Sequence, residues 1–245
     1  MRVPKIYTET LLSENVELTL NEKEAQHIVK VLRMKAGENL RLFDGSGSFY
    51  PATIVQTNKK SVVIQTTHAE AGLSESKLHT HLGQVMSRGD RMDYVIQKST
   101  ELGINEITPL TSERCELKLN AERAEKRIKH WQQVAISAAE QCGRACIPVI
   151  HPVANINDWV QQNKDKGLSL VLHHRDTQKL SDIQTTPTHV NLLIGPEGGL
   201  SQTEIEFATQ SSYISSTFGP RVMRTETAPV ACLSILQWLW GDFQI

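Results

Sequence analysis

Two short glycine-bearing stretches near the C-terminus most constrain the fold of this 245-residue chain. The first, residues 191–201 (NLLIGPEGGLS), begins with an apolar run that predicts a buried parallel strand. It ends at Ser201, three residues before Glu204, which is the spacing of a capping box at the start of a helix. The second, residues 218–229 (FGPRVMRTETAP), follows a strand-like segment and precedes an apolar helix. We therefore expect two strand–loop–helix units whose loops lie at the carboxyl ends of neighbouring strands, where open α/β sheets bind small molecules.

The glycines of the first stretch have two interpretations. Gly195, Gly198 and Gly199 can adopt backbone angles that are closed to other residues, and they let a ligand approach the main chain. Taken alone, however, a Gly-Pro-x-Gly-Gly segment is more often a structural turn. No Gly-Lys-Ser/Thr follows Gly199 and no Gly-x-Gly-x-x-Gly is present, which excludes the common nucleotide-phosphate and dinucleotide loops.

The first 72 residues have the pattern of a small β domain. A helix is predicted at 22–32, with Asn21 as its N-cap. Short strands at 40–43, 48–55 and 61–66 are separated by turn sequences, which is typical of a barrel or a sandwich.

Strands and helices alternate beyond a small, polar segment at 69–77, which we interpret as a linker. The predicted strands and helices are, in chain order, strand 79–86, helix 91–102, strand 104–110, helix 122–141, and strands 148–150, 168–172 and 190–194. This alternation predicts an α/β domain with a mostly parallel sheet and helices packed around it.

Composition excludes several classes of protein. A net charge of −1 gives no general attraction to nucleic acid, so RNA binding would depend on local basic patches. The four cysteines show neither metal-ligand spacing nor a disulfide pattern, which favours a reducing cytoplasm. The start MRVPKIY lacks the apolar core of a signal peptide, and no apolar run has membrane-spanning length.

The two glycine-bearing stretches also resemble the signature of a known family. Together with RMDYVIQKSTELGI (91–104), SERCE (112–116) and AAEQCGR (138–144), they are similar to the ribosomal RNA small subunit methyltransferase E family of the SPOUT superfamily. Phe218 stands where Leu is usual in the family, and Cys115 and Cys142 stand where Ser is usual. We expect these departures to alter packing more than chemistry.

The resemblance implies a fold and an activity. The fold would be a trefoil-knotted α/β methyltransferase domain at 73–245, preceded by a PUA-like RNA-binding β-barrel at 1–72. The activity would be transfer of a methyl group from S-adenosylmethionine to N3 of one uridine, position 1498, in 16S ribosomal RNA. The partners implied are the small ribosomal subunit and a second copy of the chain, which would dimerise through the apolar helix at 228–240. No metal and no membrane are implied.

The resemblance also implies site residues. Cofactor binding is carried over to Leu172, Gly195, Glu197, Gly199, Phe218, Gly219, Arg221, Met223 and Arg224. Leu172, Phe218 and Met223 would serve almost equally well as core residues. RNA contact is carried over to Lys30, Arg33, Lys35, Arg114 and Arg144. The alternative is an ordinary solvated surface for the lysines and a helix-end cap for Arg144.

Catalysis would need positioning and charge stabilisation rather than a covalent nucleophile. N3 of uracil carries a proton that must leave, so a base or a group that stabilises the uracil anion is required. We assign the stabilising role to Arg224, with Arg221 as the other candidate. Glu226 would orient the arginine, accept the proton or favour the start of the helix. His173, His174 and Arg175 are secondary candidates, because loop histidines are usually solvated.

Two other functions remain open at this point. One is a methyltransferase of the same superfamily that modifies a ribose 2′-hydroxyl of transfer RNA. The N-terminal β domain and the RTETAP loop weigh against it. The other is a dimeric RNA-binding protein without activity, although intact glycine loops would then serve no purpose.

Overall fold

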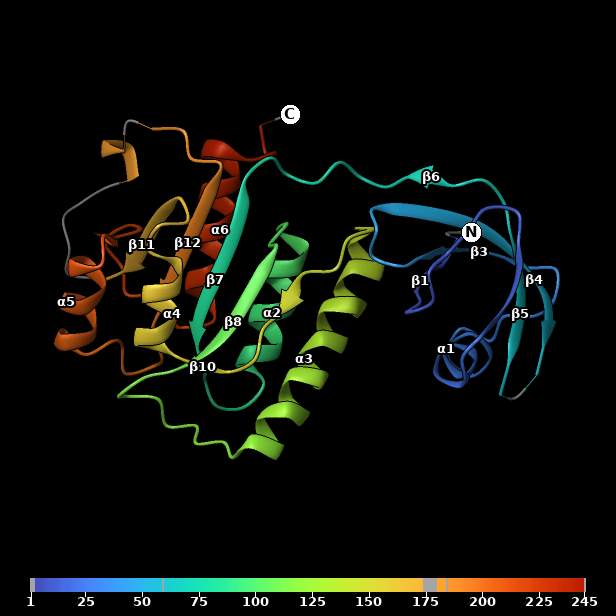
Figure 1. The fold of residues 1–245 in the computed structure, drawn as a ribbon, viewed down its shortest axis with the longest axis horizontal. Coiled ribbons are helices and arrows are strands. Elements are labelled where there is room, and N and C mark those ends of the chain that lie inside the picture. Colours follow the sequence, from blue (N-terminus) through green and yellow to red (C-terminus); the bar gives the residue numbers. More distant parts are fainter. Residues whose placement is uncertain (1–2, 59, 174–179, 184, 245) are drawn as a thin grey trace. The chain divides into compact units, whose positions relative to one another are not determined.

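The computed structural model describes residues 3–58, 60–173, 180–183 and 185–244, which form two compact units (Figure 1). The first unit comprises Met1–Glu75 and Ala139–Ile147, and the second comprises Ser76–Ala138 and Pro148–Ile245. The sequence-based prediction divides the chain after residue 72, and the first segment of the first unit ends at Glu75. No sequence pattern indicated that residues 139–147 belong with the N-terminal segment. They do so because Ala139 and Ala145 share an apolar cluster with Phe43 and Phe49.

The first unit is built on a six-stranded sheet. Its strands are β1 (Lys5–Tyr7), β2 (Glu17–Leu20), β3 (Asn39–Phe43), β4 (Ser48–Thr57), β5 (Val62–Thr66) and β6 (Glu70–Ala71). They run in the order β1-β3-β4-β5-β2, and β6 pairs with β4. The hydrogen bonding does not close into the expected barrel, because β1 and β2 lie at opposite ends of this order and do not pair within the described residues.

The predicted helix at 22–32 changes geometry partway along. Asn21 is the N-cap as expected and also forms a capping box with Glu24, and α1 spans Glu22–Gln26. From there the chain continues as a π-helix, η1 (His27–Val31). In this π-helix Ile28 is buried, whereas Val31 is 67% exposed. Arg33 then adopts a φ of 56°, in the left-handed region.

The second unit is built on a seven-stranded sheet in which every pairing of the described strands is parallel. Its strands are β7 (His79–Val85), β8 (Glu106–Thr111), β9 (Val149–Ile150), β10 (Ala154–Asn155), β11 (Leu168–Leu172), β12 (His189–Ile194) and β13 (Ile214–Ser216). They run in the order β10-β8-β7-β12-β11-β13, with β9 paired to β8. The predicted α/β domain is confirmed, although β10 was not predicted.

Helices cover both faces of this sheet (Figure 1). They are α2 (Arg91–Glu101), α3 (Ala121–Cys142), α4 (Ile156–Asn163), α5 (Gln202–Gln210) and α6 (Thr227–Trp240), together with the short 3₁₀ helix η2 (Leu180–Asp182). Neighbouring residues of a strand point to opposite faces. Leu192 of β12 accordingly belongs to the core under α2, α3 and α6, and Leu193 belongs to the core under α4 and α5.

The strand order corrects one expectation about the two glycine-bearing loops. The strands that lead into them, β12 and β13, are not neighbours, because β11 lies between them. All three strands run in the same direction, so their carboxyl ends still meet at one edge of the sheet. Leu172, at the end of β11, is thereby brought between the two loops.

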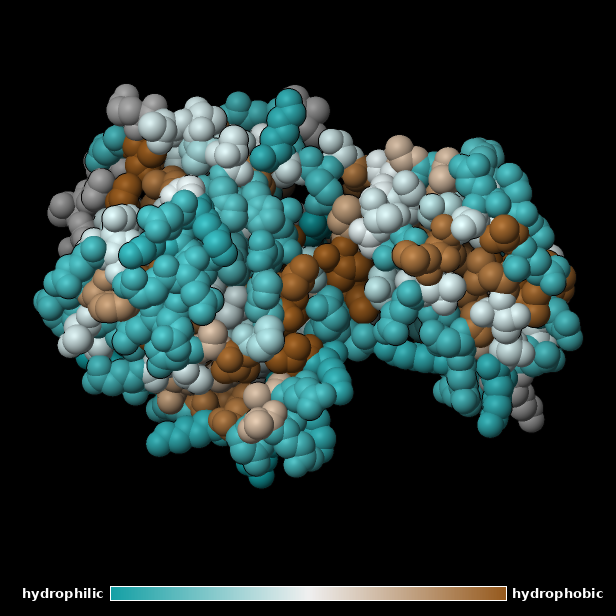
Figure 2. Space-filling view, viewed as in Figure 1, coloured by the Kyte–Doolittle hydropathy of each residue, from teal (hydrophilic) through white to brown (hydrophobic). Residues whose placement is uncertain are grey.

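The surface in view is mostly hydrophilic, and hydrophobic residues gather in limited patches on it (Figure 2). Among the helices of the described ranges, none combines the length and the apolar character that crossing a bilayer requires.

Candidate active site

A cavity of about 750 Å³ opens at the carboxyl edge of the second sheet, between the two glycine-bearing loops. Its walls come from the end of β11, the loop after β12, the loop after β13 and the first turn of α6. All nine residues predicted for the cofactor line it: Leu172, Gly195, Glu197, Gly199, Phe218, Gly219, Arg221, Met223 and Arg224. Arg114 and Glu226 line it as well. One cavity therefore gathers residues that are more than a hundred positions apart in the chain.

The first loop ends in the predicted capping box. Ser201 Oγ accepts a hydrogen bond from the backbone N–H of Glu204 at 3.3 Å, and the Glu204 carboxylate accepts one from the backbone N–H of Ser201 at 2.8 Å. The other oxygen of Glu204 accepts from the backbone N–H of Glu113 at 2.8 Å. The SERCE segment is thus fixed to the start of α5.

Arg114 is hydrogen-bonded to the same loop. Its Nη1 donates to the carbonyl oxygens of Gly198 at 3.0 Å and Leu200 at 3.3 Å. Donation to two carbonyls holds the loop in one conformation. The sequence suggested an RNA contact for Arg114, and the structure gives it this position in the cavity wall.

Glycine is needed in the two loops for different reasons. A Cβ at Gly195 would lie 2.9 Å from the backbone nitrogen of Leu200, so the loop itself leaves no room for a side chain at this position. Gly199 and Gly219 have φ values of 69° and 90°, which favour glycine, and nothing within the described chain comes within 4 Å of a Cβ built there. These two glycines therefore leave open space beside the main chain, which a ligand can use.

The two loops are joined by the buried hydroxyl group of Thr225. Its Oγ1 donates to the carbonyl oxygen of Gly195 at 2.8 Å and accepts from Nε2 of Gln84 at 3.0 Å. Ser87 Oγ lies 3.4 Å from the same oxygen. The sequence analysis did not single out Thr225, although it lies inside the FGPRVMRTETAP motif.

Arg91, the first residue of α2, is a second residue that the sequence analysis missed. Its Nη1 is paired with Oε1 of Glu197, and its Nε lies 3.7 Å from Oε2 of Glu226. The backbone N–H of Arg88 also donates to Glu197 at 3.3 Å. Arg91 is the first residue of the RMDYVIQKSTELGI motif, so the resemblance to the family included it. The motif does not show which residues Arg91 contacts.

Glu226 has an incompletely satisfied carboxylate. It occupies the N-cap position of α6 without capping the helix through its side chain. Its Oε2 is buried and accepts no hydrogen bond from the described residues; the 3.7 Å to Arg91 is an ion-pair distance, too long for a hydrogen bond. A buried carboxylate oxygen of this kind calls for a further polar partner.

The two candidate arginines differ from Glu226, because both are exposed. Within the described part of the chain, neither the Arg221 nor the Arg224 side chain makes a hydrogen bond or an ion pair. The backbone of Arg224 is fixed, since its carbonyl accepts from the N–H groups of Thr227 at 2.9 Å and Ala228 at 3.0 Å. Arg224 therefore combines a free guanidinium with a fixed main chain.

The remaining candidates are divided among several places. His173 lines the cavity, whereas His174 and Arg175 lie outside the described residues. Leu172, Phe218 and Met223 both pack on the core and line the cavity, so their two interpretations coexist.

The predicted RNA contacts outside the cavity lie in the first unit. Lys30, Arg33 and Lys35 are exposed there. Arg144 is only 7% exposed, and its Nε and Nη2 donate to the two carboxylate oxygens of Glu75 at 3.1 and 2.6 Å. This bidentate pair gives Arg144 a structural position, and we do not include it in an RNA-binding surface.

The donor set of the cavity fits a ligand with polar and apolar parts. Half-buried Leu172, Phe218 and Met223 offer an apolar wall, and the two open glycines expose main chain. The volume of the cavity lies in the range of small-molecule sites. These features suit S-adenosylmethionine, which carries an adenine, an apolar chain and charged groups.

Comparison with known proteins gives consistent results over the whole chain. A family model described as an RNA methyltransferase domain matches residues 74–237, and one described as an RNA methyltransferase PUA domain matches residues 20–67. The ribosomal RNA small subunit methyltransferase E of Buchnera aphidicola subsp. Acyrthosiphon pisum is 34% identical over 243 residues, which cover 99% of this chain and 96% of that protein.

Solved structures agree with this result. A methyltransferase of Legionella pneumophila in complex with bound SAM matches with a TM-score of 0.95 and 38% identity, covering 99% of this chain and 100% of that chain. The ribosomal RNA small subunit methyltransferase E of Neisseria gonorrhoeae, bound to S-adenosyl methionine, matches with a TM-score of 0.93 and 35% identity over the same shares of the two chains.

Proposed function

The chain belongs to the ribosomal RNA small subunit methyltransferase E family, and we propose that it methylates N3 of one uridine in 16S ribosomal RNA with S-adenosylmethionine as methyl donor. The observation that carries the proposal is the cavity, in which two glycine-bearing loops, an apolar wall and a partly unsatisfied carboxylate meet. We place the reaction in the cytoplasm, on the small ribosomal subunit.

We propose that the cofactor is held by the residues of the two loops. The exposed main chain at Gly199 and Gly219 would bind its polar edges, and Leu172, Phe218 and Met223 would pack against its apolar parts. When bound, S-adenosylmethionine supplies an electrophilic methyl group. Because the hydroxyl of Thr225 fixes the loops to each other, this half of the site is organised before any ligand arrives.

Arg224 is the residue that we assign to charge stabilisation. N3 of uracil must lose a proton, and the resulting negative charge spreads onto O2 and O4. An exposed guanidinium on a fixed main chain can donate to one of these oxygens without first breaking another contact. Arg221 lies on a less constrained part of the loop, which is why we prefer Arg224.

Glu226 is the residue that we assign to the proton. Its buried Oε2 accepts no hydrogen bond from the described chain, so it can accept one from the N3–H of a uracil that enters the cavity. Arg91 positions this carboxylate and that of Glu197 from the side of α2.

RNA binding would draw on basic side chains in each unit. In the first unit, the exposed Lys30 lies in the π-helix η1, and the exposed Arg33 and Lys35 follow it; π-helices occur often at functional sites. In the second unit, the start of α3 and the segment before it form a hollow with an apolar floor and a basic rim, lined by Leu117, Lys118, Leu119, Arg123, Lys126, Arg127 and His130. Such patches can bind phosphate although the whole chain is nearly neutral.

Two features of the family are extended to this chain as proposals. We propose that the second unit is knotted, which would hold the two loops side by side as the Thr225 contact requires. We also propose a homodimer formed through α6, because Ile235, Trp238 and Leu239 of this helix are exposed apolar residues. Leu236 belongs to the buried core and is not part of that surface.

The decisive experiment maps methyl groups on ribosomal RNA from cells with and without the protein. Mass spectrometry of nuclease fragments should find one uridine that lacks a base methyl group when the gene is absent. Purified small subunits from the deficient cells should accept one methyl group from the wild-type protein, whereas Arg224→Ala and Glu226→Gln should transfer it slowly in a single turnover even when the cofactor is saturating. A methyl group on ribose, or no transfer by protein that binds cofactor, would contradict the proposal.

A further inference from the structure

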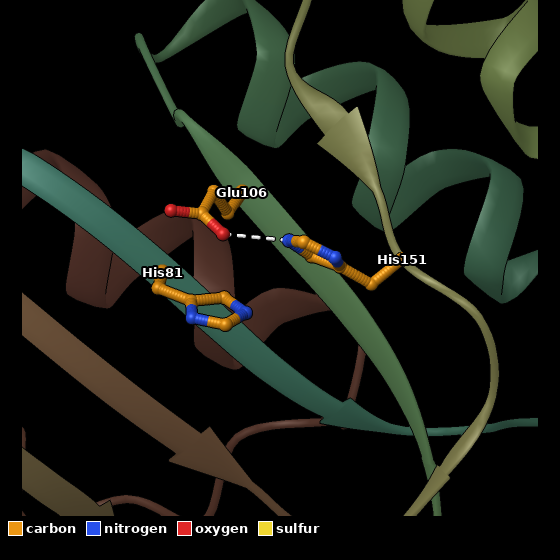
Figure 3. A group of neighbouring side chains, drawn as sticks. All are labelled: His81, Glu106 and His151. Carbon is orange, nitrogen blue, oxygen red and sulfur yellow. Dashed lines mark hydrogen bonds and ion pairs between the residues drawn. The ribbon is translucent and has the colours of Figure 1, made fainter. Parts of the chain in front are cut away.

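A cluster of histidines surrounds a glutamate at the edge of the second sheet that lies opposite the cavity. His81 comes from β7, Glu106 begins β8 and His151 directly follows β9 (Figure 3). One possible ligand atom from each of the three side chains lies within 4.8 Å of the other two. The three residues are far apart in sequence, so no metal-ligand spacing motif predicted the cluster.

The parallel sheet brings these side chains together. His81 and Glu106 are register partners on adjacent strands, so their side chains leave the sheet on the same face. The backbone N–H of His151 donates to the carbonyl of Ile107 at 2.9 Å, which fixes its place beside β8. Nε2 of His151 and Oε2 of Glu106 then lie 2.6 Å apart.

His81 and Glu106 each have a further neighbour outside the cluster. Nε2 of His81 lies 2.8 Å from the hydroxyl of Thr108 and accepts from the indole N–H of Trp159 at 3.3 Å. The second oxygen of Glu106 is bound by Nε2 of His79 at 2.7 Å. The His79 contact is an outer contact of the kind that holds a metal-binding carboxylate in position, whereas an ion on Nε2 of His81 would displace the indole N–H of Trp159.

The three proposed ligands differ in their access to solvent. His81 is only 6% exposed, whereas the side chains of Glu106 and His151 are 28% and 35% exposed, which gives an ion a path from solvent.

We propose that His81, Glu106 and His151 form a binding site for a divalent transition-metal ion, with Zn²⁺ the best match. Two imidazoles and one carboxylate are an established ligand set for this ion. The ion would take the place of the proton that His151 and Glu106 share, and water would complete its coordination from the exposed side.

The ion would be structural. Its ligands join β7, β8 and the segment after β9, and they lie at the opposite edge of the sheet from the loops of the cavity. The prediction that no metal takes part in methyl transfer concerns the cavity and not the histidine cluster, so it is independent of this proposal. An ion that binds only the folded chain raises its stability by mass action.

The test uses the full-length chain, free of any affinity tag and stripped with a chelator. Calorimetric titration with ZnCl₂ should give one ion per chain with sub-micromolar affinity, and Co²⁺ should show visible absorption bands of a low-coordinate site. Glu106→Gln should weaken binding by about 100-fold or more and abolish the Zn²⁺-dependent rise in melting temperature.

Two further variants keep the test decisive. His151→Asn changes a half-exposed ligand and serves if Glu106→Gln does not fold; it should weaken binding as strongly. His130→Gln removes a histidine on α3 that is paired with Asp93 and should leave the affinity unchanged. Sub-stoichiometric or weak Zn²⁺ binding by the wild type would overturn the proposal. So would equal losses in the His130 variant, or undiminished binding in both ligand variants.

Discussion

The hydroxyl group of Thr225 offers a direct test of whether the two glycine-bearing loops act as one binding element. Thr225→Val keeps the shape of the side chain and removes its only polar atom. The carbonyl of Gly195 then loses a donor at 2.8 Å, and the buried amide of Gln84 loses an acceptor at 3.0 Å. Both losses fall at the point where the loops meet.

The magnitude follows from these two contacts. A buried hydrogen bond contributes about 1 kcal/mol net, so the pair contributes about 2 kcal/mol to holding the loops together. If the cofactor must restore this arrangement in order to bind, the same free energy is lost from binding. That corresponds to a decrease in affinity of about 30-fold.

The assay is calorimetric titration of S-adenosylmethionine into wild type, Thr225→Val and the matched control Thr225→Ser. The serine variant keeps the hydroxyl and should bind within about threefold of wild type, because only a methyl group is lost. Thermal melting without ligand shows how far each substitution lowers the stability of the folded protein itself. Binding by folded Thr225→Val at the wild-type affinity would refute the idea that this contact organises the site.

Other substitutions test other parts of the structure. Gly195→Ala should reduce cofactor affinity by tenfold or more in a titration, because its methyl group would lie 2.9 Å from a backbone nitrogen, whereas Gly198→Ala should be tolerated, since its nearest neighbour is 3.8 Å away. Arg91→Gln should lower single-turnover methylation more than RNA binding, because both carboxylates that it holds lose their cation. Arg33→Glu should weaken RNA binding and flatten its salt dependence, measured by filter binding at several salt concentrations. Trp238→Glu should convert a dimer to monomers in sedimentation without unfolding, because this side chain is 57% exposed; a wild-type monomer would contradict the interface.

Local rules predicted most of the secondary structure correctly. The N-cap at Asn21 and the capping box at Ser201 formed as expected, because they depend only on residues a few positions apart. Gly143 directly follows α3 and has a φ of 89°, a conformation in which glycine commonly ends a helix. The family resemblance, which rests on contiguous motifs, is confirmed by relatives that match nearly the whole chain.

Long-range features could not be predicted in the same way. The π-helix at His27–Val31 has no distinct sequence pattern, so an amphipathic helix was the natural expectation. The contact of Arg91 with Glu197 and Glu226 joins residues more than 100 positions apart, and only the sheet topology decides it. The histidine cluster is the same kind of feature, because strand register alone brings His81 to Glu106.

The distribution of charge in the cavity also restricts how a uridine can be presented to it. Arg224 is exposed, whereas the Glu226 side chain is only 18% exposed and its Oε2 is buried. A base that meets both groups must pass the arginine and place its N3 edge inside the cavity. In a paired helix that edge is occupied by the opposite base, so the target must be unpaired or turned out of its stack before it can enter. On the proposed function, the basic patches of the two units would therefore bind RNA around an exposed uridine, and the cavity would select for a base that is free to leave the helix.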